Sequence, residues 1–281
     1  MQKALKKYFA FFVLPTLTAF CISFVIPFVS GAALSFTEFT TVTNARFVGL
    51  SNYAKAFSES AEFLNSLWFT IKFTVVSVIA VNAIAFLLAL LLTRGIKGTN
   101  LFRTVFFMPN LIGGIVLGYI WQLIINGVLY PRGVTLLADA KYGFWGMVVL
   151  MNWQMAGYMM IIYIAGIQNI SGELTEAASI DGATPFQTLW KITVPMVMPS
   201  ITICTFLTLT NSFKMFDQNL ALTGGAPSEQ TTMLALNIYK TFYGRTGYEG
   251  VGQAKAVIFF LLLAAGALSQ LWLTRSREVE S

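Results

Sequence analysis

Residues 171–195 read Ser171-Gly-Glu-Leu-Thr-Glu-Ala-Ala-Ser-Ile-Asp-Gly-Ala-Thr-Pro-Phe-Gln-Thr-Leu-Trp-Lys-Ile-Thr-Val-Pro195. Ser171 is a suitable N-cap residue, and Glu173 and Glu176 fall in the first turns, where acidic groups complement the positive end of a helix. Asp181-Gly182 can end that helix, because glycine readily takes the left-handed conformation found just beyond helix C-termini. The stretch therefore predicts a short helix that stops at an elbow at Gly182.

A second short helix is expected directly after the elbow. Thr184 is a natural cap, Pro185 suits the first helical position, and Gln187 stands where a capping box places Glu or Gln. Together the two helices would offer these apolar side chains: Leu174, Ala177, Ala178, Ile180, Phe186, Leu189 and Trp190. Such a surface needs cover from the protein's own helix ends or from another protein. The alternative is an amphipathic connector that lies in the lipid interface.

On both sides of this loop the chain is strongly apolar. Of its 281 residues, 56% are hydrophobic and 11% charged, with a mean hydropathy of +0.70, whereas soluble domains carry about 25% charged residues. The chain is therefore predicted to be an all-α integral membrane protein with one transmembrane domain, residues 1–281, and a cytoplasmic loop at 171–193. Six stretches have the roughly 20 apolar residues needed to cross a bilayer: about 8–32, 67–93, 105–126, 144–169, 195–216 and 254–274.

The distribution of Lys and Arg predicts the orientation. These residues are denser in the two terminal tails and in loops 94–103 and 171–193 than in the other connections. The positive-inside rule places the denser set in the cytoplasm, so both termini are expected there. Because the basic residues cluster at the ends of apolar runs, the net charge of +6 is explained without nucleic acid.

Several classes of site are excluded by residue counts and spacing. The chain has no histidine, which rules out His-based metal sites, Ser-His-Asp triads and imidazole switches. Cys21 and Cys204 stand inside apolar stretches, which argues against a disulfide framework or a metal site. The sequence also lacks the G-x-x-x-x-G-K-[ST] phosphate loop. We therefore expect no catalytic residue, no metal and no cofactor bound by this chain, and ATP would have to be hydrolysed by another polypeptide.

The quoted loop resembles the EAA motif of ABC importer permeases. Glu176-Ala177-Ala178, three residues, Gly182, nine residues, Ile192, one residue and Val194-Pro195 match the pattern E-A-A-x3-G-x9-I-x-L-P, except that Val194 replaces Leu. In that family this loop is the coupling helix, which docks in a cleft of the ATP-binding subunit. The resemblance thus implies a coupling role for these residues: Glu176, Ala177, Ala178, Asp181, Gly182, Phe186, Ile192 and Pro195.

Other segments are similar to the carbohydrate-uptake branch of these permeases, as the first of two non-identical subunits. They are Phe47–Tyr53, Phe102–Pro109, Phe213–Asp217, Leu222–Pro227 and Ile238–Phe242. The large periplasmic domain of the maltose subunit is missing, because the 37–64 segment is short. The resemblance implies the type I (MetI-like) importer permease fold in a bacterial inner membrane. It also implies four kinds of partner: a second homologous permease, two ATPase subunits that bind ATP and Mg, an extracytoplasmic solute-binding protein, and a sugar.

Polar and aromatic residues inside the expected spans are candidates for a sugar pathway, because sugar rings have hydroxyl edges and apolar faces. By residue type they are Asn110, Trp121, Asn152, Trp153, Gln154, Tyr158, Asn211 and Ser212. Similarity to the maltose permease adds Gly114, Met155 and Met215 to the same pathway. For each one, the alternative is an interhelical hydrogen bond or a place in the interfacial aromatic belt.

Three other functions compete with sugar import. Glycerol phosphate or a related polyol phosphate would need a basic residue in the pathway, and Lys72, Lys214 and Lys255 are the candidates in or near spans. A membrane enzyme would need clustered carboxylates or histidines at one interface. A stand-alone carrier commonly keeps an intramembrane carboxylate, but Asp and Glu are absent from the six span interiors. Asp217, at an outer end, is assigned to gating or loop structure.

Overall fold

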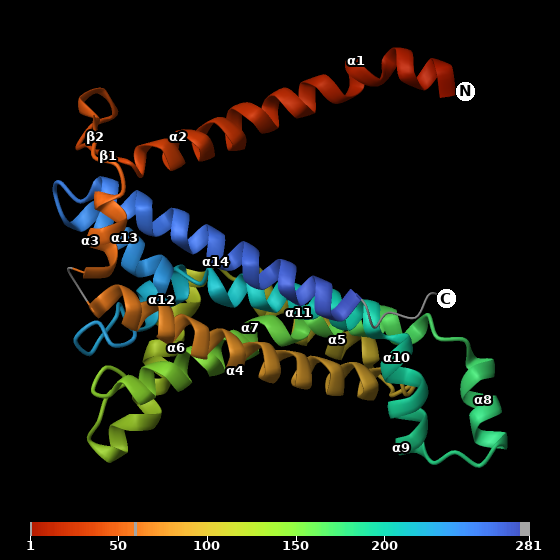
Figure 1. Ribbon diagram of the computed structural model, residues 1–281. Coiled ribbons are helices and arrows are strands. Elements are labelled where there is room, and N and C mark those ends of the chain that lie inside the picture. The colour runs from red at the N-terminus through yellow and green to blue at the C-terminus, as the bar shows by residue number, and fades with distance from the viewer. Residues whose placement is uncertain (1, 59–60, 276–281) are drawn as a thin grey trace. The chain divides into compact units, whose positions relative to one another are not determined.

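The computed structural model describes residues 2–58 and 61–275. The chain forms two compact units, one of residues 1–61 and 238–259 and the other of residues 62–237 and 260–281. Helices make up most of both units (Figure 1). In the described part of the chain the only strands are β1 (Thr37–Glu38) and β2 (Arg46–Phe47), an antiparallel pair in which Thr37 lies opposite Phe47.

The first unit begins with a long apolar helical segment. It consists of α1 (Gln2–Phe20), a π-helical turn (Cys21–Val25) and α2 (Ile26–Leu34). The two short strands, a 3-10 turn (Val42–Asn44) and α3 (Ser51–Ser58) follow. The end of α13 (Leu234–Gly244) and the start of α14 (Glu249–Arg275) complete the unit.

Asn52 fixes the short strands within the first unit. Its buried side-chain amide donates hydrogen bonds to the carbonyl oxygens of Ser35 at 2.9 Å and Thr37 at 2.8 Å. Gly250 of α14 lies against the same place, since a Cβ added there would stand 2.2 Å from the Thr37 oxygen. The Phe47–Tyr53 segment that resembles sugar permeases thus contains the anchor of this region.

The second unit holds the remaining elements. Its long helices are α4 (Ala61–Leu92), α6 (Gly114–Leu129), α7 (Ala140–Gln168) and α11 (Met198–Phe213). Its shorter helices are α5 (Thr99–Phe107), α8 (Gly172–Ile180), α9 (Pro185–Thr188), α10 (Val194–Met196) and α12 (Asp217–Leu222). Two 3-10 turns (Met108–Leu111 and Tyr130–Arg132) and a π-helical turn (Leu189–Thr193) link them.

Helix α7 is the centre of the second unit. About two thirds of its most apolar window is buried, 67% against 28% for α4 and 17% for α6. Its buried residues include Met147, Leu150, Met159 and Met160, which pack in one core with Phe73 of α4. Because methionine is unbranched and flexible, it fills the irregular gaps between helices that cross at different angles.

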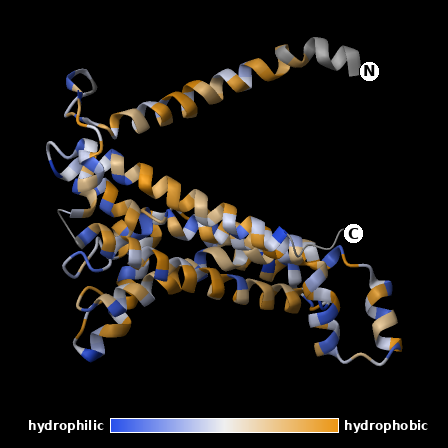
Figure 2. Cartoon of the chain, in the orientation of Figure 1, coloured by the Kyte–Doolittle hydropathy of each residue, from blue (hydrophilic) through white to orange (hydrophobic). Residues whose placement is uncertain are grey.

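The described residues contain five helices that are long and apolar enough to cross a membrane. They are Phe11–Leu34, Glu62–Leu92, Gly114–Arg132, Ala140–Gln168 and Glu249–Arg275, and apolar residues dominate along them (Figure 2). A sixth span exists if Pro185–Met196 and Met198–Phe213, which bend by 69° at their junction, are taken together. The tail after Arg275, whose expected place is the cytoplasm, lies outside the described residues.

The expected continuous helix at 105–126 is interrupted. Helix α5 ends at Phe107, a 3-10 turn covers Met108–Leu111, and α6 begins only at Gly114. Pro109 lacks an N–H for the helical ladder, and Gly113 takes an extended conformation (φ −61°, ψ 141°). The polar segment before the expected span is helical as well, because α5 begins at Thr99.

The expected helix at 195–216 also differs in the structure. A bend at Val197 separates α10 from α11, and it lies between Pro195 and Pro199. Each proline removes one backbone donor, which explains why the helix breaks there. At the other end α11 stops at Phe213, so that residues 214–216 are not helical and lead into α12.

Candidate functional site

The elbow between α8 and α9 has the geometry that the sequence predicts. Gly182 takes φ +80°, in the left-handed region. The Ala183 N–H donates to the Ala178 carbonyl at 2.9 Å, and the Gly182 N–H donates to the Ser179 carbonyl at 3.1 Å. These two bonds form a Schellman motif, the standard glycine-dependent end of a helix. Ser171 occupies the N-cap position of α8, but its side chain makes no capping hydrogen bond.

The capping box expected at the start of α9 is confirmed. The Gln187 N–H donates to Thr184 Oγ1 at 3.3 Å, while the Thr184 N–H donates to Gln187 Oε1 at 2.8 Å. Pro185 follows the cap at the first helical position. The sequence therefore determines both the end of α8 and the start of α9 locally, which makes the turn between them well defined.

Most apolar side chains of this loop are exposed. Ile180 is 85%, Phe186 70% and Trp190 56% exposed, and the rings of Phe186 and Trp190 lie 6.2 Å apart. Leu174 is exposed as well, whereas Ala178 is buried. We call Leu174, Ala177, Ile180, Phe186 and Trp190 the elbow surface; all five are exposed in the described part of the chain.

The other expected coupling residues lie around the elbow. Glu176 and Asp181 are exposed, and Pro195 is half-buried beyond the π-helical turn. A hollow of about 270 Å³ lies between the turn after α8 and the segment formed by α9 and the π-helical turn, and its lining includes Asp181, Gly182 and Ile192. Figure 1 shows α8 and α9 at one end of the long helices of the second unit.

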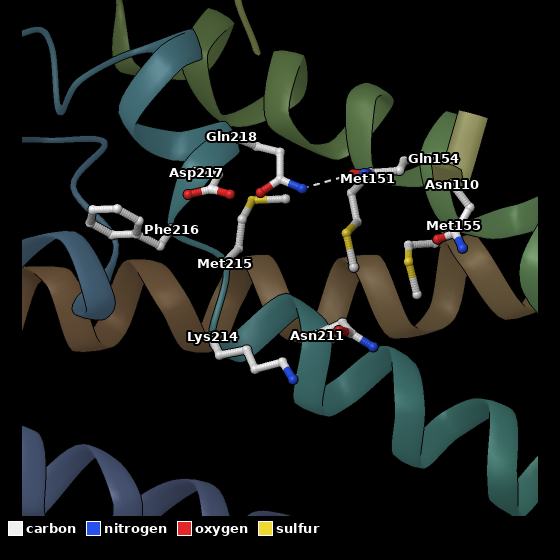
Figure 3. Close-up of a pocket in the computed structure, with 10 residues that line it drawn as sticks. All are labelled: Asn110, Met151, Gln154, Met155, Asn211, Lys214, Met215, Phe216, Asp217 and Gln218. Atoms are coloured by element: carbon white, nitrogen blue, oxygen red, sulfur yellow. Dashed lines mark hydrogen bonds between the residues drawn. The ribbon is translucent and has the colours of Figure 1, made fainter. Parts of the chain in front are cut away.

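A second feature is a cavity of about 290 Å³ beside the end of α11 at Phe213 and the start of α12 (Figure 3). We call it the cavity at the α11 break. It is lined by side chains from the 3-10 turn, α7 and residues 211–218: Asn110, Met151, Gln154, Met155, Asn211, Lys214, Met215, Phe216, Asp217 and Gln218. Amides and thioethers dominate this set. Amides can both donate to and accept from hydroxyl groups, while methionines offer adaptable apolar contacts. The lining therefore suits a neutral, hydroxyl-rich molecule.

A chain of hydrogen bonds holds one wall of this cavity. Gln218 Nε2 donates to Gln154 Oε1 at 2.8 Å (Figure 3), and Gln154 Nε2 donates to the Ile112 carbonyl at 3.4 Å. Ile112 lies in the break between the 3-10 turn and α6. The start of α12 and the break before α6 are thereby connected through a single side chain of α7.

Helix α12 is held in place by close packing on α6. Cβ atoms added to Gly114 and Gly118 would lie 2.7 Å from Asp217 Cβ and 2.5 Å from Ala221 Cβ. One turn further along the same face, Gln122 Nε2 donates to the Leu222 carbonyl at 2.8 Å. The spacing of four residues puts all three positions on one side of α6. Gly114, a predicted pathway residue, thus supports the cavity wall.

Five of the predicted pathway residues line this cavity and the others do not. The five are Asn110, Gln154, Met155, Asn211 and Met215. Asn152 and Trp153 belong to a separate, largely apolar hollow of about 330 Å³ that also includes Ile84, Pro109 and Ala156. Because 152–153 and 154–155 lie on different faces of α7, neighbouring residues serve different surfaces.

The remaining candidates, Trp121, Tyr158 and Ser212, make other contacts. Trp121 packs edge-to-face on Trp153, with ring centroids 5.6 Å apart, and Tyr158 packs on Phe107 at 6.2 Å. Ser212 is fully buried, and its hydroxyl donates to the Leu209 carbonyl of its own helix. None of these three lines the cavity at the α11 break.

Five lining residues are absent from the predicted sugar pathway: Met151, Lys214, Phe216, Asp217 and Gln218. Met151 could have been found, because it stands one turn before Met155 on the same face. The other four follow from the break at the end of α11, which no local signal places at Phe213.

The three basic candidates lie in different places. Lys214 lines the cavity. Lys72 lies on the exposed side of α4 with its ammonium 5.3 Å from the centre of the Trp68 ring, and Lys255 is buried beside Thr241.

The described residues hold no group of three or more His, Cys, Asp or Glu side chains that could bind a metal ion. Cys204 is buried, and its thiol lies 3.7 Å from the Met159 carbonyl.

Comparison with known proteins finds similar chains. The probable starch degradation products transport system permease protein of Thermoanaerobacterium thermosulfurigenes is 43% identical over 96% of this chain and 94% of its own length. The multiple sugar-binding transport system permease protein of Streptococcus mutans is 31% identical over 99% of both chains. A chain from the crystal structure of a bacterial ABC transporter that imports the acidic polysaccharide alginate has the same fold. It gives a TM-score of 0.81 at 20% identity, with 98% of each chain covered.

A family model matches residues 82–279, which contain the elbow, the cavity at the α11 break and most of the long helices. That match covers well over half of the chain. The chain therefore belongs to the family of binding-protein-dependent transport system inner membrane components.

Proposed function

We propose that this protein is one of two permease subunits in an ATP-driven importer of a neutral sugar or oligosaccharide. The observation that carries the proposal is the 43% identity, over nearly the whole of both chains, to a permease named for starch degradation products. The resemblance to a multiple-sugar permease supports the same substrate class. Membership of the transport family makes the chain a permease subunit and not an enzyme.

The cavity at the α11 break is the proposed sugar site. Four side-chain amides, those of Asn110, Gln154, Asn211 and Gln218, line it. Each amide can meet a hydroxyl as donor or acceptor, which matches the edge of a sugar ring. Met151, Met155 and Met215 supply apolar contacts for the C–H faces. In the assembled transporter this site would open toward the second permease, and the two chains would line the pathway together.

The elbow surface is the proposed contact with the motor. The chain has no phosphate loop, so ATP and Mg would bind two separate ATPase subunits. Each permease would place its elbow in a cleft of one ATPase subunit. Phe186 and Trp190 are the large exposed side chains that such a cleft would bury. Closure of the ATPases on ATP would then displace the elbow and switch the access of the pathway between the two sides.

The proposed orientation follows from the positions of the basic residues. Loop 171–193, both termini and the 94–103 loop would lie in the cytoplasm. The extracytoplasmic side would then receive the solute-binding protein, which delivers the sugar.

The test is purification of the chain with its partners, followed by uptake measurements. Mass spectrometry of the complex isolated in mild detergent should find an ATPase, a second permease with an EAA motif and, under cross-linking, a solute-binding protein. Proteoliposomes of that complex should take up labelled maltooligosaccharides only when ATP and the binding protein are both present. Isolation of the chain alone under conditions that keep related importers intact, or uptake without ATP, would contradict the proposal.

One observation favours a second substrate class, polyol phosphates. Lys214, one of the basic candidates from the sequence, lies in the cavity. Asp217 lines the same cavity and brings a negative charge to it, which disfavours an anionic solute. Glycerol phosphate added in excess should therefore leave maltooligosaccharide uptake unchanged, whereas competition would favour the phosphate reading.

A further inference from the structure

The elbow lies in the chain between α7 and α11, and these two helices contact each other next to the segment that forms it. A Cβ added to Gly166 of α7 would lie 2.2 Å from Ser200 Oγ and 2.7 Å from Val197 Cγ1. Further along, the Cys204 thiol reaches the Met159 carbonyl at 3.7 Å. We call this seam, residues 159–166 of α7 with Val197 and residues 198–208 of α11, the stem of the elbow.

Asn82 of α4 bonds to both helices of the stem. Tyr163 Oη of α7 donates to Asn82 Oδ1 at 2.8 Å. Asn82 Nδ2 donates to Thr208 Oγ1 of α11 at 3.3 Å and to the Val78 carbonyl of its own helix at 2.8 Å. The amide oxygen and both amide hydrogens thus have partners. Tyr163 is 2% and Thr208 0% exposed, so the contacts on the stem side are closed to solvent.

The surroundings make this arrangement hard to replace. The Tyr163 ring packs edge-to-face against Phe86 of α4, with centroids 5.4 Å apart. Asn82 stands in the interior of an apolar helix, where an amide that lost its partners would find few others. The three side chains consequently favour one relative position of α4, α7 and α11.

We infer that Asn82 is a positioning residue for transport, because it joins α4 to the stem of the elbow. A displacement of the elbow then moves α4, α7 and α11 as one body, instead of being absorbed by sliding between the helices. This role rests on the proposed function, in which the elbow receives the movement of the ATPases. Asn82 is distant in sequence from the EAA segment. The inference therefore adds a residue outside that segment to those that transmit the movement of the ATPases to the sugar pathway.

The test measures sugar molecules transported per ATP hydrolysed, in proteoliposomes of the complete purified assembly. Thr208→Val removes the hydroxyl that Asn82 contacts and keeps the side-chain shape. Its matched control is Thr210→Val on the same helix, because the Thr210 hydroxyl donates to the Phe206 and Leu207 carbonyls of its own helix. Asn82→Leu and Tyr163→Phe remove the other partners.

We expect Thr208→Val and Asn82→Leu to lower the ratio about threefold, the size of effect that an interhelical hydrogen bond has in a membrane. Thr210→Val should keep the wild-type ratio. Tyr163→Phe should lower the ratio by itself but add little in the Asn82→Leu background, because both act through one amide. A thermal melt of each assembly accompanies these measurements, since a merely structural role would lower the melting temperature without changing the ratio.

Wild-type ratios in both Thr208→Val and Tyr163→Phe, or an equal loss in Thr210→Val, would overturn the inference. These two variants decide the question even if Asn82→Leu does not assemble. A wild-type assembly that hydrolyses ATP without taking up sugar gives a different result: it would contradict the proposed function, and with it this role of Asn82.

Discussion

Gln154 illustrates how much a single side chain can organise. It receives a hydrogen bond from Gln218 and donates one to the Ile112 carbonyl, so that it connects α12 with the break before α6. Its neighbours Asn152 and Trp153 belong to another hollow. The properties of the proposed sugar site therefore depend on which residues of α7 face it, at the level of single positions.

Gln154→Leu should weaken sugar transport by about tenfold at low sugar concentration. The change leaves the Gln218 amide without its partner and removes a group that could bond to hydroxyls, each worth about 1 kcal/mol or more. Uptake by proteoliposomes, measured as a function of sugar concentration, tests this. Asn152→Leu on the other face of α7 should have a smaller effect, and the reverse order would move the sugar site to the apolar hollow.

Gly157→Ala should destabilise the protein by about 1–3 kcal/mol. The new Cβ would stand 1.8 Å from the Phe106 carbonyl oxygen, and backbone atoms cannot yield as a flexible side chain does. Gly127→Ala on α6 is the control, because a Cβ there meets nothing within 4 Å. Thermal unfolding in detergent should separate the two variants, and an unchanged melting temperature for Gly157→Ala would show that α5 does not lie against α7 in the membrane.

At the scale of elements, the elbow is defined by backbone geometry more than by side-chain packing. Gly182 needs a positive φ to close the Schellman motif, while the Thr184–Gln187 capping box starts the next helix. Almost everything else in the loop is exposed. The relative direction of α8 and α9 therefore depends on a few local bonds.

Gly182→Val should uncouple ATP hydrolysis from uptake. A β-branched residue disfavours the left-handed conformation by about 1–2 kcal/mol. The turn between α8 and α9 would then open, and the elbow surface would no longer fit the ATPase subunit. ATPase activity and sugar uptake, measured on the same proteoliposomes, should diverge. Gly172→Val is the control, because Gly172 has no positive φ and open space around it. Wild-type uptake in Gly182→Val would count against the coupling role.

The elements that could be predicted from the sequence are those with local causes. Thr184, Pro185 and Gln187 determine the start of α9 by contacts within a few residues, and Gly182 determines the end of α8 in the same way. The break at Met108–Ile112 contains Pro109, and the bend at Val197 lies between Pro195 and Pro199. Membrane helices often tolerate proline, however, so composition alone does not tell a break from a kink. The end of α11 at Phe213 depends on how α12 packs on α6, which no local pattern encodes.

The proposed sugar site was predictable to the same limited degree. Three residues predicted by their type (Asn110, Gln154 and Asn211) and two added by the family resemblance (Met155 and Met215) line the cavity. Trp121, Trp153 and Tyr158 have the same chemistry but pack on other aromatic rings. Which face of a helix turns toward a cavity depends on its neighbours in space, and the near-uniform apolarity of α7 gives no periodic signal from which to read it.

At the scale of the whole molecule, the orientation in the membrane can be measured directly. In a variant with Cys21 and Cys204 replaced by alanine, Thr175→Cys on the elbow should react with a membrane-impermeant maleimide only in inverted vesicles. Asn44→Cys in the 37–64 segment should react only in spheroplasts or protoplasts, in which the outer face of the membrane is exposed to the reagent. Both positions are exposed, so access is decided by the bilayer. Labelling of both from one side would contradict the predicted orientation.

The wall of the proposed sugar site rests on two glycines, Gly114 and Gly118, where α12 lies so close to α6 that a methyl group would not fit. The volume available to a solute is thus determined by the packing of α12 on α6, through residues that the solute does not contact. Substitution of these two glycines by slightly larger residues should adjust the size of the cavity. Each added carbon should push α12 toward the cavity and shorten the longest oligosaccharide that can enter. Engineering the length selectivity of this transporter would begin there, and the amides that recognise the sugar could be left as they are.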